Sequence, residues 1–255
     1  MTTRRPRGSF LRRRTATGSA AQQIADGVHR LQLGIVSAYL VETDDGLVLV
    51  DSGEVGRGDR IVETVRSLGH AVGRIDAIVV THHHPDHIGS LADLARRTEA
   101  AVFAHPADAP IVRGERSWRG HNPATTLGRL LGPLLVRLQP GRLEPTPVDH
   151  LLDDGDRRAA LGGAQVIHTP GHTAGHVAFL LPRNGGVLIA GDAASNVHRL
   201  RSGGHWLTAM VSDDVAAANA SFRRLAGLEF EVAVFGHGAP LLSGAAERFR
   251  AVAGR

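Results

Sequence analysis

The segment 82–87, with the sequence HHHPDH, places four histidines and one aspartate within six positions. In extended backbone, residues two apart point to the same side of the chain. His82 and His84 can therefore face one point, while His83 faces away from it. Because neutral imidazole is the commonest metal ligand among side chains, this spacing predicts one half of a metal site. The alternative is a solvated polar loop that happens to be rich in histidine.

The chain is expected to turn directly after these histidines. Pro85 favours extended backbone for His84 before it, and helical spacing resumes at Ile88. Such a turn can bring Asp86 and His87 close to the first two imidazoles. These side chains would provide ligands for two metal ions, and the mixture of imidazole and carboxylate suits zinc, iron or manganese.

Further ligands of the same kind are present later in the chain, whereas cysteine is absent. Thiolate metal sites, disulfides and cysteine nucleophiles are therefore excluded. The stretch HTPGHTAGH supplies His172, with His168 and His176 nearby, LIAGD supplies Asp192, and VFGHG supplies His237. Glycines flank these positions and permit tight turns that aim a side chain inward.

Short runs of β-branched and apolar residues predict the strands that would position these side chains. They lie at residues 28–33, 35–43, 46–53, 75–81, 100–105, 164–169, 176–182, 186–192 and 231–237. Helical spacing of apolar residues predicts helices at residues 58–70, 88–97, 213–226 and 243–253. Nearly every polar cluster follows the end of a strand, which is common in mixed α/β enzymes whose sites are built from loops.

Taken in this order, the motifs resemble those of the metallo-β-lactamase superfamily. Its HxHxDH motif is matched by His82, His84, Asp86 and His87, and its later ligands by His172, Asp192 and His237. The stretch VLVDSG resembles the family's early strand and turn, which would place Asp51 behind the ligands. The resemblance covers roughly residues 28–253 and implies an α+β fold, a four-layer αββα sandwich with a dinuclear site at one edge.

The resemblance also implies a role for each position. One metal ion would be held by His82, His84 and His172, and a second by Asp86, His87 and His237, with Asp192 as the bridge. Two zinc ions are expected, with iron or manganese as alternatives. Asp86 would also be the catalytic residue that orients a metal-bound hydroxide. His83 is expected to be a spacer that faces solvent or supports the ligands, and His168 and His176 to orient or pack rather than bind metal.

The same residues favour one branch of the superfamily. An aspartate at position 192 resembles glyoxalase II and lactonases more than true β-lactamases, in which a cysteine is common there. Lactonases typically carry a tyrosine just after this aspartate, but the stretch GDAASNVHR has none, and Tyr39 is the only tyrosine. We therefore predict a metal-dependent hydrolase of a small ester, thioester or lactone. The alternatives are a metal-containing binding or sensory protein without turnover and a nucleic-acid-processing hydrolase.

The rest of the chain limits its organisation and partners. Its 255 residues suffice for one large domain, predicted at residues 27–255, within which residues 107–150 are a lid, an insertion or a dimer contact. Six of the 29 basic residues lie in positions 1–14. The rest of the chain has 23 basic and 25 acidic residues, so its charge is nearly balanced. The basic character therefore belongs to the N-terminal residues 1–26, which we predict to be a disordered tail. No apolar run reaches the ~18 residues of a membrane span. We expect a cytoplasmic protein with a small-molecule substrate, no stable nucleic-acid partner, and a homodimer as one possibility.

Overall fold

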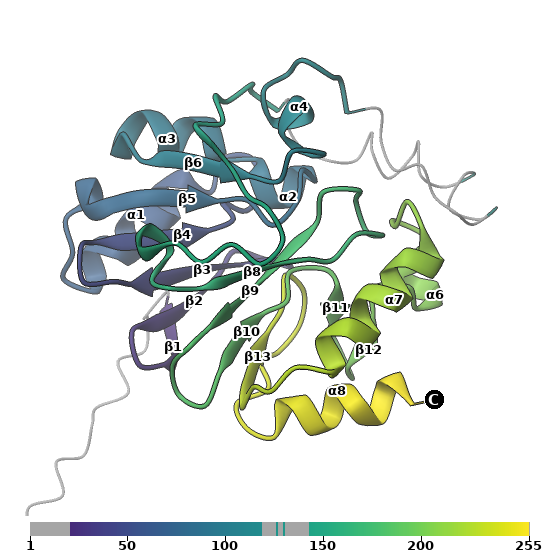
Figure 1. Cartoon of the computed structure of the whole chain (residues 1–255). Helices are drawn as coiled ribbons and strands as arrows, with labels where there is room; N and C mark the ends of the chain where they lie inside the picture. The colour runs from purple at the N-terminus through teal and green to yellow at the C-terminus, as the bar shows by residue number, and fades with distance from the viewer. Residues whose placement is uncertain (1–20, 119–125, 127–129, 131–142, 255) are drawn as a thin grey trace, which may run out of the picture.

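The computed structural model describes residues 21–118, 126, 130 and 143–254, and two sheets dominate it (Figure 1). The first sheet has seven strands in sequential order, antiparallel from β1 to β4 and parallel from β4 to β7. Its strands are β1 (Ala21–Ala25), β2 (Val28–Gln32), β3 (Ser37–Glu42), β4 (Leu47–Val50), β5 (Ile75–Val79), β6 (Ala101–Ala104) and β7 (His150–Leu151).

The second sheet has four strands in the order β13-β10-β9-β8, and only the β10–β13 pair is parallel. Its strands are β8 (Gln165–His168), β9 (Val177–Leu181), β10 (Val187–Ile189) and β13 (Val232–Val234). A short antiparallel ribbon follows β10 and consists of β11 (Ala194–Ser195) and β12 (Arg201–Ser202).

Helices cover the outer face of each sheet. The α-helices are α1 (Gly58–Ser67), α2 (Pro85–Ile88), α3 (Leu91–Thr98), α4 (Ala109–Val112), α6 (Trp206–Ala209), α7 (Val215–Ala226) and α8 (Ala245–Ala253), with 3-10 turns at Val72–Arg74 and Ala159–Leu161. Among the described residues, no helix combines the length and apolar character that crossing a bilayer requires.

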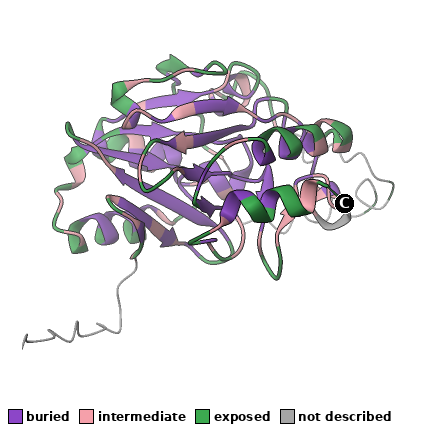
Figure 2. Cartoon of the chain, turned by 60° about the horizontal axis from the view of Figure 1, so that its bottom comes forward, coloured by how far each residue is buried: buried purple, intermediate pink, exposed green. Residues whose placement is uncertain are grey.

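The alternation of side chains along each strand divides the interior into three hydrophobic cores. In β3, for example, Leu40 packs toward α1 and α3, whereas Tyr39 and Val41 point into the space between the sheets. The outer face of the second sheet packs against Phe222 of α7 and Phe249 of α8. Three cores separate four layers, so the predicted αββα sandwich is confirmed; Figure 2 shows the strands largely buried and the helices exposed on one face.

One sequence prediction differs from the structure, and another lies largely outside the described residues. The predicted domain start at residue 27 misses β1, which begins at Ala21 and pairs with β2. This edge strand has the sequence AQQIA, in which only Ile24 is buried, so it lacks the apolar alternation that marks a strand. The predicted lid falls largely on residues 119–142, most of which lie outside the described residues.

Candidate metal centre

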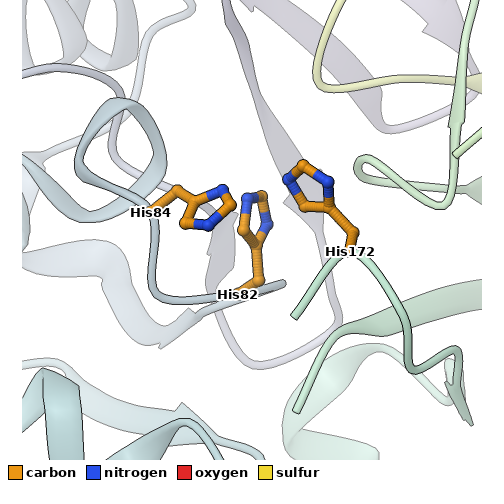
Figure 3. Close-up of side chains that lie close together, drawn as sticks. All are labelled: His82, His84 and His172. Carbon is orange, nitrogen blue, oxygen red and sulfur yellow. The ribbon is translucent and has the colours of Figure 1, made fainter. Parts of the chain in front are cut away.

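Three imidazoles converge from loops of the two sheets. His82 and His84 follow β5 of the first sheet, and His172 lies between β8 and β9 of the second. Figure 3 shows their rings turned toward one another. The ring centroids lie 4.7 Å apart for His82 and His84, 4.7 Å for His82 and His172, and 4.6 Å for His84 and His172. One nitrogen from each ring lies within 4.8 Å of the other two, which is suitable for a shared ion.

A second set of ligand atoms lies beside the first. Asp86 and His87 come from α2, and His237 follows β13. His237 Nε2 lies 3.2 Å from Asp86 Oδ2, and His87 Nε2 lies 3.8 Å from the same oxygen. These three side chains also offer atoms within 4.8 Å of one another.

Asp192 lies between the two sets. Its Oδ2 is 3.4 Å from His172 Nε2 in the first set and 3.4 Å from His237 Nε2 in the second. Its Oδ1 is 3.7 Å from His87 Nε2. The structure thus brings all seven predicted residues together, and one carboxylate faces both sets. Their individual roles as ligands stay predictions.

The chemistry of these atoms fits metal ions. His82 Nε2, His87 Nε2 and Asp192 Oδ1 are buried and have no hydrogen-bond partner among the described residues. A buried polar atom without a partner costs ~1–3 kcal/mol, and bound cations would remove that cost. A β-carbon added at Gly236 would lie 2.2 Å from Asp192 Oδ1 and 2.7 Å from His87 Cε1, so the centre has room only for glycine there.

Asp51 fixes the orientation of two imidazoles from behind. It accepts a hydrogen bond of 2.8 Å from His87 Nδ1 and bonds of 2.8 Å from both the Thr81 hydroxyl and the Thr81 amide. Because the Thr81 hydroxyl donates to Asp51, its oxygen accepts from His82 Nδ1 at 3.0 Å. Both rings therefore present Nε2 to the centre, an arrangement typical of metal-bound histidine. Asp51 itself has a left-handed φ of 61°, a strain that non-glycine residues show mainly at functional sites.

The other two imidazoles that face Asp192 are held in the same way. His237 Nδ1 donates to the Ile35 carbonyl at 3.0 Å. His172 Nδ1 lies 3.2 Å from the Ser212 hydroxyl, which donates to backbone carbonyls and so accepts from the imidazole. In both rings Nε2 is the nitrogen that faces Asp192.

His176 and His168 do not join the ligand sets. His176 Nε2 accepts a bond of 2.9 Å from the Asp192 amide, and its Nδ1 donates to the Thr169 hydroxyl at 2.7 Å. Both nitrogens of His176 are thus used to position Asp192. His168 donates through Nε2 to the Ala174 carbonyl at 2.9 Å.

Of the two roles predicted for His83, the one that faces solvent is wrong, and its contacts agree with the other, a residue that supports the ligands. His83 is buried, and its Nδ1 lies 3.0 Å from Oδ2 of Asp108, a residue that no sequence pattern singled out. Asp108 also accepts bonds from the His83 amide at 3.0 Å, the Thr173 hydroxyl at 2.8 Å and the Gly175 amide at 2.8 Å. This carboxylate fastens the loop of His82 and His84 to the loop of His172.

The two ligand sets differ in the pKa values of their side chains. Burial raises the pKa of Asp86, but the charges of His87 and His237 outweigh it and lower the value to about 2. Burial lowers the pKa of His87, yet Asp86, Asp192 and Asp51 together raise it to about 9. In the first set, burial and then the neighbouring imidazoles hold the pKa of His82 well below its ordinary value.

Comparisons with known proteins agree with this geometry. A model of the metallo-beta-lactamase superfamily matches residues 31–237. The chain is 30% identical over 235 residues to a probable metallo-hydrolase of Bacillus subtilis, YflN, which covers 87% of this chain and 88% of that protein. It is 29% identical over 202 residues to a hydroxyacylglutathione hydrolase of Aeromonas hydrophila, covering 77% of this chain but only 58% of that enzyme. A solved metallo-beta-lactamase family protein of Thermus thermophilus superposes with a TM-score of 0.67 at 26% identity, covering 91% of this chain and 80% of that chain.

The chain therefore belongs to the metallo-β-lactamase superfamily, as the motifs predicted. Its cluster of histidine and aspartate side chains and its similarity to metallo-hydrolases make it a metal-dependent hydrolase of that superfamily.

Proposed function

We propose that this hydrolase uses two zinc ions to cleave a small ester, thioester or lactone. The observation that carries the proposal is the pair of complete ligand sets that share Asp192. A site meant for a single ion would have no need for Asp86, His87 and His237 to converge beside the three imidazoles of the first set.

Zinc held by imidazole and carboxylate supplies Lewis acidity: it polarises a carbonyl oxygen and lowers the pKa of bound water to ~7. The chain's own residues supply the rest. Asp86 lies at the edge of the centre, 23% exposed, and its low pKa keeps it ionised at neutral pH. It can therefore accept a hydrogen bond from an attacking water and orient it. Asp51 holds the ring of His87 in place, and His176 holds the backbone of Asp192 in place.

Two features bear on the substrate. The name of the Aeromonas relative describes hydrolysis of an acyl group carried by glutathione, and this supports a thioester. Ala193 and Ala194, both buried, follow Asp192 in this chain. The tyrosine that lactonases typically carry just after this aspartate is therefore not found here, and we place esters and thioesters before lactones.

The test is a substrate panel with zinc-loaded protein, measured together with metal content. The panel contains small esters, thioesters, lactones and phosphodiesters, and the control is Asp192→Asn, which has nearly the same shape without the charge. We expect about two zinc ions per chain and turnover of an ester or thioester that is lost in the variant. A fully loaded protein with no turnover would favour the binding or sensory alternative, and turnover of the phosphodiester alone would favour nucleic-acid processing.

A further inference from the structure

Residues of β12, α7 and α8, three elements that contact one another, line a pocket. Figure 1 shows these elements next to one another. Its volume is about 440 Å³, within the range of small-molecule sites. None of the seven predicted metal ligands lines it. The pocket therefore needs an explanation of its own.

Three arginines give this pocket a strong positive charge. Arg199 and Arg201 come from the segment around β12, and Arg223 comes from α7. No described residue that lines the pocket is acidic, and none of the three arginines makes an ion pair with another described residue. The neighbouring Arg224 differs, because its guanidinium lies 2.9 Å from Asp154. Of the two arginines of α7, therefore, Arg224 has an acidic partner, whereas Arg223, which lines the pocket, has none among the described residues.

Arg201 gives the most direct indication that the pocket binds an anion. Its Nε is buried and has no hydrogen-bond partner in the described part of the chain. A buried guanidinium N–H normally donates to an oxygen, since leaving it unpaired costs free energy. An oxyanion in the pocket would satisfy this donor with a charge-assisted bond, the kind for which the guanidinium fork is best suited.

Neutral donors and an apolar surface complete the lining. Ser202 donates to Asn219 Oδ1 at 2.8 Å, which leaves the Asn219 amide N–H groups to donate to a ligand. Burial and the charges of Arg201 and Arg199 lower the pKa of His205, which also lines the pocket and is therefore neutral at neutral pH. Leu200 and Val252 add apolar surface. The combination suits a molecule with a highly charged end and a less polar body.

We propose that this pocket binds a small organic phosphate, with a di- or polyphosphate group against Arg199, Arg201 and Arg223. Three unpaired positive charges match a polyanion better than a single carboxylate, because a monoanion would leave two of them uncompensated. A pocket of this size also accepts the organic part of a nucleoside diphosphate. The proposal does not depend on the reaction at the metal centre.

The test is isothermal titration of zinc-loaded protein with inorganic pyrophosphate, ADP and acetate at constant ionic strength. The double variant Arg201→Gln/Arg223→Gln removes two of the guanidinium groups. Arg248→Gln is the matched control, because Arg248 is exposed on α8 and does not line the pocket. Asp192→Asn serves to separate binding at the metal centre from binding in the pocket.

We expect pyrophosphate and ADP to bind the wild-type protein. Their affinity for the double variant should be at least tenfold lower. Their affinity for Arg248→Gln and for Asp192→Asn should be within twofold of that for the wild type. Acetate should bind far more weakly than either phosphate. Equal binding to the double variant and the wild type, or binding that disappears in Asp192→Asn alone, would overturn the proposal. So would an acetate affinity equal to that of pyrophosphate. Circular dichroism of the double variant shows whether a loss reflects the pocket and not unfolding.

Discussion

The two ligand sets of the metal centre use similar side chains in different electrostatic settings. In the first set, His82 and His172 are deeply buried, and the pKa of His82 is held low by burial and by neighbouring imidazoles. In the second set, Asp86 and His237 are 23% and 22% exposed, and burial is outweighed by carboxylates that raise the pKa of His237 well above its ordinary value. The first set therefore offers at least one neutral imidazole to a cation, whereas the second stores protons that a cation must displace.

This difference bears on how the charges of the cluster balance in the metal-free protein. Asp86, Asp192 and Asp51 all lie beside His87, whose raised pKa makes it a counter-charge for these three carboxylates. Metal ions would replace these protons, and affinity at the second set should therefore depend more steeply on pH. The two sets should also respond separately to substitutions that touch only one of them.

The largest effect is expected from Asp192→Asn, which removes the charge that faces both sets. Zinc content should fall from about two ions per chain to about one or fewer, and hydrolysis should fall by more than ~100-fold. The fold should persist, because Asp192 belongs to none of the three hydrophobic cores. Elemental analysis, turnover and circular dichroism together provide the measurement. Normal zinc content in this variant would mean that the two sets do not share a ligand.

Replacing Asp108 should weaken the first set selectively. Asp108→Ala leaves the His83 amide, the Thr173 hydroxyl and the Gly175 amide without their buried acceptor. We expect a loss of about 3–5 kcal/mol in the free energy of unfolding, and zinc affinity about tenfold lower at the first set but not at the second. Urea unfolding and competitive zinc titration measure the two quantities.

The control for Asp108 is Asp154→Ala. Asp154 also pairs with a cation, Arg224, at 2.9 Å, but both side chains are nearly half exposed. Exposed pairs contribute only ~0–1 kcal/mol, so Asp154→Ala should lower the free energy of unfolding by no more than this.

A second variant, Asp108→Asn, keeps one acceptor oxygen. If it folds and binds both zinc ions as the wild type does, Asp108 has no role in positioning the first set.

The sign of each pKa shift predicts a stability maximum for the metal-free protein. The pKa of His87 is raised from 6.5 to about 9, so its contribution is complete below pH 6.5 and is lost as pH rises toward 9. Burial lowers the pKa of His176 to about 3. As the pH drops below 6.5, His176 therefore binds a proton in the unfolded chain but not in the folded one, and stability falls until the pH approaches 3. The maximum should therefore lie near pH 6.5, with an alkaline loss on the order of 3 kcal/mol from His87.

Urea unfolding of chelator-treated protein across this pH range measures the profile. Zinc-loaded protein is the comparison, and its alkaline loss should disappear, because a ligating imidazole is already deprotonated. An alkaline loss of equal size in both samples would show that it arises outside the second set.

Much of the fold and of the centre could be predicted from the sequence, because those parts depend on short-range patterns. Short runs of apolar and β-branched residues in β3, β4 and β5 mark the central strands, and HxHxDH places four predicted ligands on one turn. The contacts of Asp108 were not predictable, since they join residues 65 and 67 positions apart whose meeting depends on how the two sheets pack. The burial of His83 has the same cause, because its partner lies on a different loop.

The smallest predicted effect concerns Tyr39, which supports the second set as Asp108 supports the first. Burial raises the pKa of Tyr39 to about 12, so its hydroxyl stays neutral, donating to the Phe235 carbonyl at 2.6 Å and accepting from the Phe235 amide at 3.1 Å. Phe235 precedes His237 by two residues. Tyr39→Phe should lower the free energy of unfolding by about 1–2 kcal/mol.

Because this contact lies next to His237, the same variant should weaken zinc binding at the second set by less than about tenfold and leave the first set unchanged. Competitive zinc titration resolves the two steps. Ser67→Ala is the control, since it removes a hydroxyl bond within α1, away from the centre. If Tyr39→Phe lowers the zinc affinity of both sets equally, the two sets are not supported separately. The substitution would then act on the whole centre.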